Sequence, residues 1–278
     1  MELTALSWNL FHGRDHPPDP ALRTWRSRLL RFDERNETHI QVNRDLTEEF
    51  ATLISRAEWD VALLQECPPR FAEPLARACR AEWHRALTSR NSCGPLRALL
   101  ARQNPDLIAS GEGGSNLTLV RVPGRLGGIA ERREMAIHEG PPERRSMGFI
   151  RTASGICVAN LHATHTPAKL AAQDVMKAAR AACEWAGGAP LIFGGDLNLR
   201  PRNSGAFERL REEFGLAPPT APDAIDHILC RGLEVVEPPA QWPDEQRELP
   251  FEGRALRLSD HAPVQARFRA AEPHLLRN

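Results

Sequence analysis

The sequence predicts one α/β domain whose core is a mixed or antiparallel β-sheet. Short apolar runs of strand length recur along the whole chain, and segments with helical spacing lie between several of them. No internal repeat and no low-complexity linker divides the 278 residues into two parts. With 41% hydrophobic residues and 26% charged residues, the chain has enough apolar surface for a sizeable core. We therefore expect a single domain over residues 1–278.

The expected strands are apolar runs bounded by charged residues, glycine or proline. From the N-terminus they are Leu3–Leu10, Val61–Gln65, Asn116–Val122, Gly148–Arg151, Ile156–His162, Pro190–Gly194, Ile225–Leu229 and Ala262–Arg269.

Three segments between these runs have the spacing of an amphipathic helix. In the first, Leu22, Trp25, Leu29 and Phe32 follow one helical face. The second has apolar residues at 46, 50, 53 and 57. The third covers Ala168–Trp185 and ends before two glycines, which are common beyond a helix C-terminus.

The overall charge excludes no large class of ligand, because 36 basic residues balance 36 acidic ones. Lys169 and Lys177 are the only lysines, so 34 of the basic residues are arginine, the better bidentate ligand for phosphate. A GC-rich genome also explains this bias. The six cysteines form no C-x-x-C pair, and neither a signal peptide nor a membrane span is evident. We expect a cytoplasmic protein, and a monomer.

Polar residues of the kind found in catalytic sites lie at the ends of several predicted strands. Each alone has an ordinary structural explanation, such as a turn or a helix cap. Together they share one chemical theme and predict a site at the sheet edge. They are Asn9, Glu66, His162, Asp196, Asn198, Asp226, Asp260 and His261.

Oxygen ligands dominate this set, which favours Mg²⁺ or Mn²⁺ over zinc. The H-x-x-H pair His162 and His165 leaves zinc as the weaker alternative. Histidine is suited to proton transfer near neutral pH. Asp260 and His261 are adjacent, so on a strand their side chains should diverge, and Asp226 is the candidate to orient His261.

The ordered segments SWN (7–9), LLQE (63–66), NLH (160–162), GGDLN (194–198), IDHIL (225–229) and SDHAPV (259–264) resemble the endonuclease/exonuclease/phosphatase superfamily, which includes deoxyribonuclease I. The resemblance spans nearly the whole chain. It implies a four-layer α/β/β/α sandwich of two packed mixed β-sheets flanked by helices, with the active site at one edge, and a divalent-metal-dependent phosphoesterase activity using Mg²⁺ or Mn²⁺.

The resemblance also implies a role for each matching residue. Glu66 would bind the metal, helped by Asn9 and Asp260. Asp196 and Asn198 would hold the attacking water or the scissile phosphate. His261, oriented by Asp226, would contact the phosphate or act as general base, and His162 would be the general acid. The family's glutamate partner of that acid has no clean counterpart in this sequence. Asn116, and Arg90 with Asn91 in SRNSCG (89–94), are weaker substrate-binding candidates.

An Arg-rich insertion at about residues 14–43 separates Asn9 from Glu66. It is either a rim that selects the substrate or a surface helix that covers the outer sheet. The leading function is hydrolysis of phosphodiester bonds, with nucleic acid as the first candidate substrate. A phosphatase or phosphodiesterase for small molecules or lipid headgroups is the alternative, and a non-catalytic binding protein on the same fold is a remote one.

Overall fold

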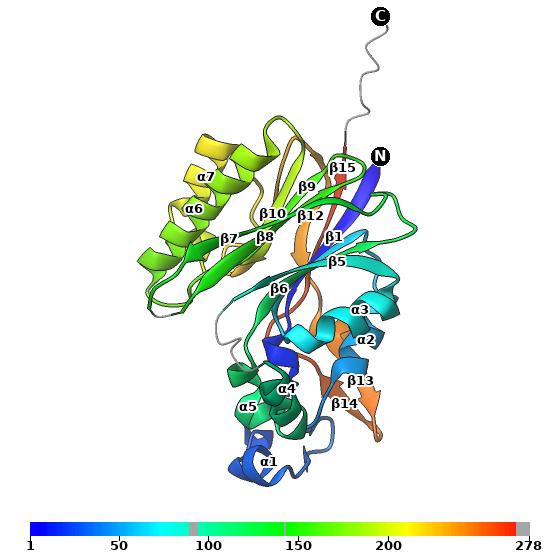
Figure 1. Ribbon diagram of the computed structural model, residues 1–278. Coiled ribbons are helices and arrows are strands. Elements are labelled where there is room, and N and C mark those ends of the chain that lie inside the picture. Colours follow the sequence, from blue (N-terminus) through cyan, green and yellow to red (C-terminus); the bar gives the residue numbers. More distant parts are fainter. Residues whose placement is uncertain (89–93, 142, 271–278) are drawn as a thin grey trace, which may run out of the picture.

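The computed structural model describes residues 1–88, 94–141 and 143–270, and two large β-sheets pack face to face in it (Figure 1). Each run that the sequence predicts as a strand overlaps one of their strands, with bounds that differ by one to three residues at several ends. Within the described residues, no helix is long and apolar enough to cross a membrane.

The first sheet is six-stranded, in the order β12-β15-β1-β4-β6-β5. Strand β1 runs parallel to β4 and antiparallel to β15, so the sheet is mixed, as expected. The strands are β1 (Glu2–Asn9), β4 (Val61–Cys67), β5 (Ala81–Leu87), β6 (Ser115–Arg121), β12 (Glu234–Gln241) and β15 (Val264–Arg269).

The second sheet is five-stranded, in the order β11-β10-β9-β8-β7. It is also mixed, because β9 and β10 are parallel whereas the other neighbours are antiparallel. The strands are β7 (Ile129–His138), β8 (Arg145–Thr152), β9 (Cys157–His162), β10 (Leu191–Asp196) and β11 (Asp226–Arg231).

Helices cover the outer face of each sheet and complete the predicted four layers (Figure 1). Helices α2 (Thr47–Arg56) and α3 (Ala72–Cys79) pack on the first sheet through one apolar cluster. Helices α6 (Ala168–Ala186) and α7 (Ala206–Phe214) pack on the second sheet through another. A third cluster, which includes Leu63 and Ile192, fills the space between the sheets.

The insertion lies beyond the end of the first sheet rather than over its face (Figure 1). It contains the 3-10 turn η2 (Pro20–Leu22), helix α1 (Trp25–Leu30) and the short pair β2 (Glu34–Arg35) and β3 (Ile40–Gln41). It joins α5 (Pro105–Glu112), where Gln41 Nε2 donates to Asp106 Oδ2 over 2.8 Å. Near it lie α4 (Gly94–Gln103) and the hairpin β13 (Glu248–Phe251) and β14 (Arg254–Arg257).

The apolar face predicted for the first helix is mostly exposed to solvent. Leu22 is buried, but Trp25 and Phe32 are 65% and 50% exposed. Helix α1 has only six residues and ends at Arg31, whose φ of 59° turns the chain away before Phe32. The buried side of α1 is instead polar: the Ser27 hydroxyl donates to the Gln41 side chain.

Candidate active site

The site lies where the space between the two sheets changes from apolar to polar. Side chains alternate along β1, so Leu3 and Ala5 join the apolar cluster between the sheets. Two and four residues further on, the same face carries Ser7 and Asn9, both buried. The alternation therefore carries Asn9 into the gap between the sheets, at the C-terminal end of its strand.

The second sheet has the same arrangement. Val158 on β9 and Ile192 on β10 belong to the cluster between the sheets, and His162 and Asp196 lie four residues further on the same face. Asp196 is in register with His162 on one side and with Asp226 on the other. Polar ends of neighbouring strands thus meet at one edge, which is why residues far apart in the sequence form one site.

Glu66 reaches the site because the backbone of β4 is irregular there. The pairing of β4 with β6 shifts register between Leu64 and Cys67, and Glu66 has a φ of 46°. A bulge re-aims the side chain that it carries. The Glu66 carboxylate lines the same cavity as His162 and Asp196.

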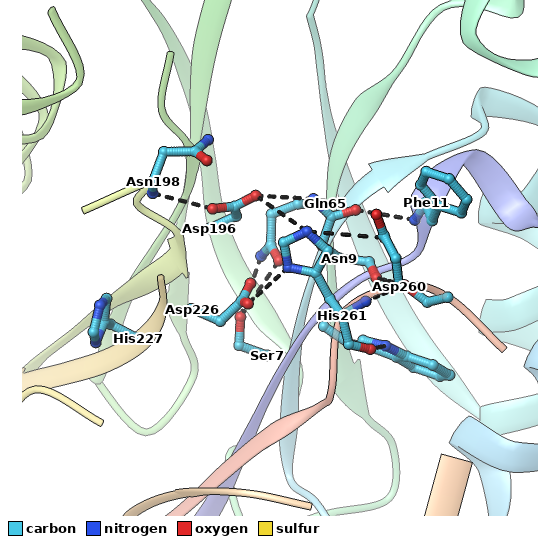
Figure 2. A network of polar contacts seen from close by, with 12 residues as sticks. Ser7, Asn9, Phe11, Gln65, Asp196, Asn198, Asp226, His227, Asp260 and His261 are labelled. Carbon is cyan, nitrogen blue, oxygen red and sulfur yellow. Dashed lines mark hydrogen bonds and ion pairs between the residues drawn. The ribbon is translucent and has the colours of Figure 1, made fainter. Parts of the chain in front are cut away.

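His261 and Asp226 form the pair that the sequence predicts. His261 Nδ1 lies 2.7 Å from Asp226 Oδ2, and Figure 2 shows the imidazole among the carboxylates of Asp226, Asp196 and Asp260. Burial lowers the pKa of His261, but Asp226, Asp196 and Asp260 together raise that pKa to about 10. Without bound metal, His261 is therefore an imidazolium at neutral pH.

Asp260 and His261 do not diverge as adjacent residues on a strand would. They lie in a bend before β15, and His261 Nε2 is 3.9 Å from Asp260 Oδ1. The preceding Ser259 has a φ of 60°, and its hydroxyl donates to Asn9 O over 2.6 Å and accepts from His261 N. This turn places both side chains in the cavity.

Asp196 is the centre of the hydrogen-bonded network (Figure 2). Its Oδ2 atom accepts from Asn9 Nδ2 at 3.0 Å and lies 3.4 Å from His162 Nε2. Its Oδ1 atom accepts from the backbone N–H of Asn198 at 3.1 Å. Burial, Asp226 and Glu66 raise the pKa of Asp196 to about 7, against opposing effects of His261 and Asn9. This carboxyl group can therefore exchange a proton near neutral pH.

The partner of His162, which the sequence left open, is Arg145. Arg145 Nη1 lies 3.1 Å from His162 Nδ1, and Arg145 Nη2 lies 3.3 Å from Glu143 Oε2. A guanidinium has no acceptor, so Nδ1 accepts and the proton of His162 is on Nε2. Burial and then Arg145 hold the pKa of His162 well below 6.5. These contacts favour a neutral hydrogen-bond donor over the general acid that the resemblance implies.

The structure adds residues that the sequence analysis did not select. The central cavity has a volume of about 650 Å³. The predicted residues that line it are Glu66, Asp196, Asn198, Asp260, His162 and His261. Its other polar lining residues are His12, Arg14, Glu143, Arg145 and Thr166, together with His165 of the H-x-x-H pair. Only the nearness of His12 and Arg14 to Asn9 in the sequence could have pointed to them.

Of the three weaker candidates, the structure describes only Asn116. Asn116 is fully buried, and its Nδ2 atom donates to Ser146 O over 2.7 Å, so it connects strands and does not line the cavity. This corrects its predicted contact with substrate: the polar residue lies in the packed interior, where its side chain satisfies a backbone carbonyl. Arg90 and Asn91 lie outside the described residues.

The charge of the cavity fits a hard divalent cation. Glu66, Asp196 and Asp260 line it, and crowding raises the pKa of Asp196 as described above. Asp226 is buried and bonds the lining residue His261. Asp196, Asp226 and His261 also bring one ligand atom each within 4.8 Å of one another. The carboxylates of Glu66 and Asp260 are more accessible to an ion, because Asp226 and His261 already bond each other. Carboxylates crowded into one cavity favour a bound divalent cation, because oxygen atoms of acidic side chains are the ligands that such cations prefer.

The sequence matches the family model described as "Endonuclease/Exonuclease/phosphatase family" over residues 6–261. The chain belongs to this family. Members of the endonuclease/exonuclease/phosphatase family are hydrolases that act on phosphoesters. None of the curated proteins compared with the sequence matches it significantly.

Solved structures with the same fold differ in what their names state. An endonuclease/exonuclease/phosphatase family protein from Bacteroides thetaiotaomicron is 15% identical, with a TM-score of 0.64 over 98% of this chain and 99% of that one. A mannosyl-6-phosphatase from the same species is 16% identical, with a TM-score of 0.62 over 96% and 99%. Truncated TDP2 from Caenorhabditis elegans is 15% identical, with a TM-score of 0.57 over 97% and 98%. At these identities the likeness concerns the fold alone.

Proposed function

We propose that this chain is a Mg²⁺- or Mn²⁺-dependent phosphodiesterase, with nucleic acid as its first candidate substrate. The observation that carries this proposal is the order of charges along the site edge. The central cavity is lined by four carboxylates, four histidines and two arginines. Arginine or lysine residues line a further cavity on each side of it.

The flanking cavities each share residues with the central one. On one side, a cavity of about 710 Å³ shares Asn198 and is lined by Lys169, Arg200 and Arg209. On the other side, a cavity of about 300 Å³ shares Phe11 and Arg14. Positive charge on both sides of a metal-binding centre suits a substrate with phosphates along its length. This supports a polyanionic substrate, although the net charge of the protein is zero.

In this proposal Glu66 and Asp260 hold the cation, with the side-chain oxygen of Asn9 nearby. The Asn9 oxygen accepts from Phe11 N at 3.0 Å and retains a second lone pair. When bound, the cation supplies positive charge to the phosphoryl oxygens.

The protein's own groups would carry the remaining chemistry. Asp196 takes a proton from the attacking water as the water oxygen bonds to phosphorus and the P–O ester bond breaks. His261, held by Asp226, and His162 Nε2–H donate hydrogen bonds to the phosphoryl oxygens. The alkoxide that leaves takes its proton from solvent. Asn198 donates to Ala163 O at 3.0 Å, which leaves its second amide hydrogen for the substrate.

A substrate panel tests the proposal and its alternative. It contains single-stranded DNA, duplex DNA, RNA, bis-p-nitrophenyl phosphate, p-nitrophenyl phosphate and mannose 6-phosphate, each with Mg²⁺ and with Mn²⁺. The panel includes mannose 6-phosphate because one of the solved structures with the same fold is named a mannosyl-6-phosphatase. We expect diesters to be hydrolysed in preference to monoesters, with a loss of activity in excess EDTA.

Three outcomes would contradict the proposal. Undiminished activity in excess EDTA would refute the metal requirement. Hydrolysis of monoesters alone would favour the small-molecule phosphatase. Binding of substrate without turnover, unchanged in His261→Ala, would favour the non-catalytic alternative.

A further inference from the structure

Arg14 stands between the central cavity and the smaller flanking cavity and lines both. It is the first residue of the Arg-rich insertion and directly follows Gly13. Its Nε atom donates to Phe11 O over 3.2 Å, and its guanidinium carbon lies 3.7 Å from the centre of the Phe11 ring. These two contacts fix the plane of the guanidinium at the junction of the cavities.

The positive charge of Arg14 is not paired with a carboxylate of any residue that the structure describes. Among the described residues, no acidic oxygen lies within ion-pair distance of it, and its two Nη groups make no hydrogen bond to the protein. Burial lowers the pKa of Arg14, whereas Asp106, Glu66, Asp260 and Asp15 raise it through space. A partly buried cation held only by distant charges is stabilised when an anion binds it.

The wall of the smaller cavity, which we call the side cavity, is basic. Arg23 and Arg28 line it with Arg14. Arg23 Nη1 lies 2.6 Å from His16 Nε2. Because a guanidinium only donates, His16 accepts and adds no charge of its own.

Two acidic residues also belong to the wall of the side cavity, and both are engaged with the protein. Asp15 is buried, and its Oδ2 atom accepts from Val42 N at 2.9 Å. Asp106 accepts from Gln41 Nε2 at 2.8 Å. The wall therefore has three arginines against two acidic residues, and the acids already accept hydrogen bonds from the protein, so this side cavity suits an anionic group.

We propose that the side cavity binds a second, non-scissile phosphate of the substrate and that Arg14 is its principal ligand. A planar guanidinium matches two oxygens of one phosphate, and the Nη groups of Arg14 are available for them. This inference rests on the proposed function and names the part of the substrate that the insertion recognises. It assigns the insertion to the rim rather than to a cover of the sheet.

A binding experiment tests the inference independently of turnover. Calorimetry with Mg²⁺ compares thymidine 3′,5′-bisphosphate with thymidine 5′-monophosphate. We expect the bisphosphate to bind the wild-type protein about tenfold to hundredfold more tightly, as for hydrogen bonds between charged groups. Arg14→Gln should remove most of this difference in affinity between the two nucleotides, and Arg14→Lys should restore part of it.

The matched control is Arg26→Gln on the same segment. Arg26 is exposed, stacks on Phe32 at 5.3 Å and does not line the side cavity. It should leave the ratio unchanged. Thermal unfolding of each variant establishes that it is folded. Equal binding of the two nucleotides by wild-type protein, or equal losses in Arg14→Gln and Arg26→Gln, would overturn the inference.

A kinetic experiment separates this inference from the proposed function. The dinucleotide dTpdT is compared with its 5′-phosphorylated and 3′-phosphorylated forms. A lower KM for one phosphorylated form, lost in Arg14→Gln, supports the inference. If all three are hydrolysed equally, the proposed function stands and the inference fails. If none is hydrolysed but the bisphosphate still binds through Arg14, the nucleic-acid part of the proposed function fails and the second-phosphate site stands.

Discussion

Arg145 Nη1 lies 3.1 Å from His162 Nδ1, so this histidine has a cation where the resemblance implied a carboxylate partner. Arg145 is the first residue of β8, and His162 is the last residue of the neighbouring strand β9. Antiparallel pairing brings these ends together. The contact selects the neutral form of His162 with its proton on Nε2, facing Asp196 and Glu66.

The first prediction concerns this contact. In metal-free Arg145→Met, the pKa of His162 should rise, because one of the two main causes that lower it is removed. It should stay below 6.5, since burial remains the larger cause. NMR titration of the histidine ring measures it. Arg151→Met, on the same strand and paired with Glu131, is the control and should leave this pKa unchanged. A pKa of His162 above 6.5 in the wild-type protein would contradict the interpretation.

The second prediction concerns His261 and pH. Its folded-state pKa is raised to about 10, mainly by Asp226 against the opposing effect of burial. The resulting stabilisation is fully present below pH 6.5, the unfolded value, and is lost as pH rises through 10. Urea unfolding of metal-free protein should show a free energy of unfolding that falls between pH 7 and pH 10.5. Asp226→Asn should flatten this fall. It should also lower kcat by about 10²- to 10³-fold, because His261 is no longer held as a hydrogen-bond donor to the phosphoryl oxygens. An equally steep fall in the variant would assign the pH dependence to other groups.

The third prediction concerns the metal. Glu66→Gln should weaken Mn²⁺ binding by more than the roughly 10- to 100-fold seen for outer partners of metal ligands. Isothermal calorimetry measures the affinity. Glu143→Gln removes a carboxylate from the same cavity, but one that is paired with Arg145, and serves as the control. Equal losses in the two variants would mean that the cation responds to the total charge of the cavity and not to Glu66.

The fourth prediction concerns the glycines of GGDLN. Gly195 has a φ of 131°, and a Cβ atom there would lie 1.9 Å from Leu161 O on the adjacent parallel strand. Gly195→Ala should lower the free energy of unfolding by about 3 kcal/mol or more, because backbone must move and the conformation is strained. Gly188→Ala, where the added Cβ meets nothing within 4 Å, should have little effect. Chemical denaturation measures the free energy of unfolding of both variants. Equal values for Gly195→Ala and Gly188→Ala would contradict the prediction.

Much of the fold and most of the site follow from the sequence. The apolar runs predict the strands because alternation and burial are local properties of a segment. Asn9, Glu66, Asp196, Asp226 and His261 were predicted because they lie at or near the ends of such runs, in segments that resemble one family. The Ala168–Trp185 pattern likewise predicted α6, whose apolar face packs on a sheet.

Only the tertiary structure decided which other residues contact the predicted site residues. The bulge that turns Glu66 into the cavity depends on pairing with β6, and the Arg145–His162 contact depends on the register of β8 and β9. Arg14 acquires its position from the insertion, in which Trp25 and Phe32, predicted on one apolar face, are exposed. Sequence pattern specifies which face of an element is apolar, whereas contacts between distant segments depend on register and on turns, which the pattern of any one segment does not contain.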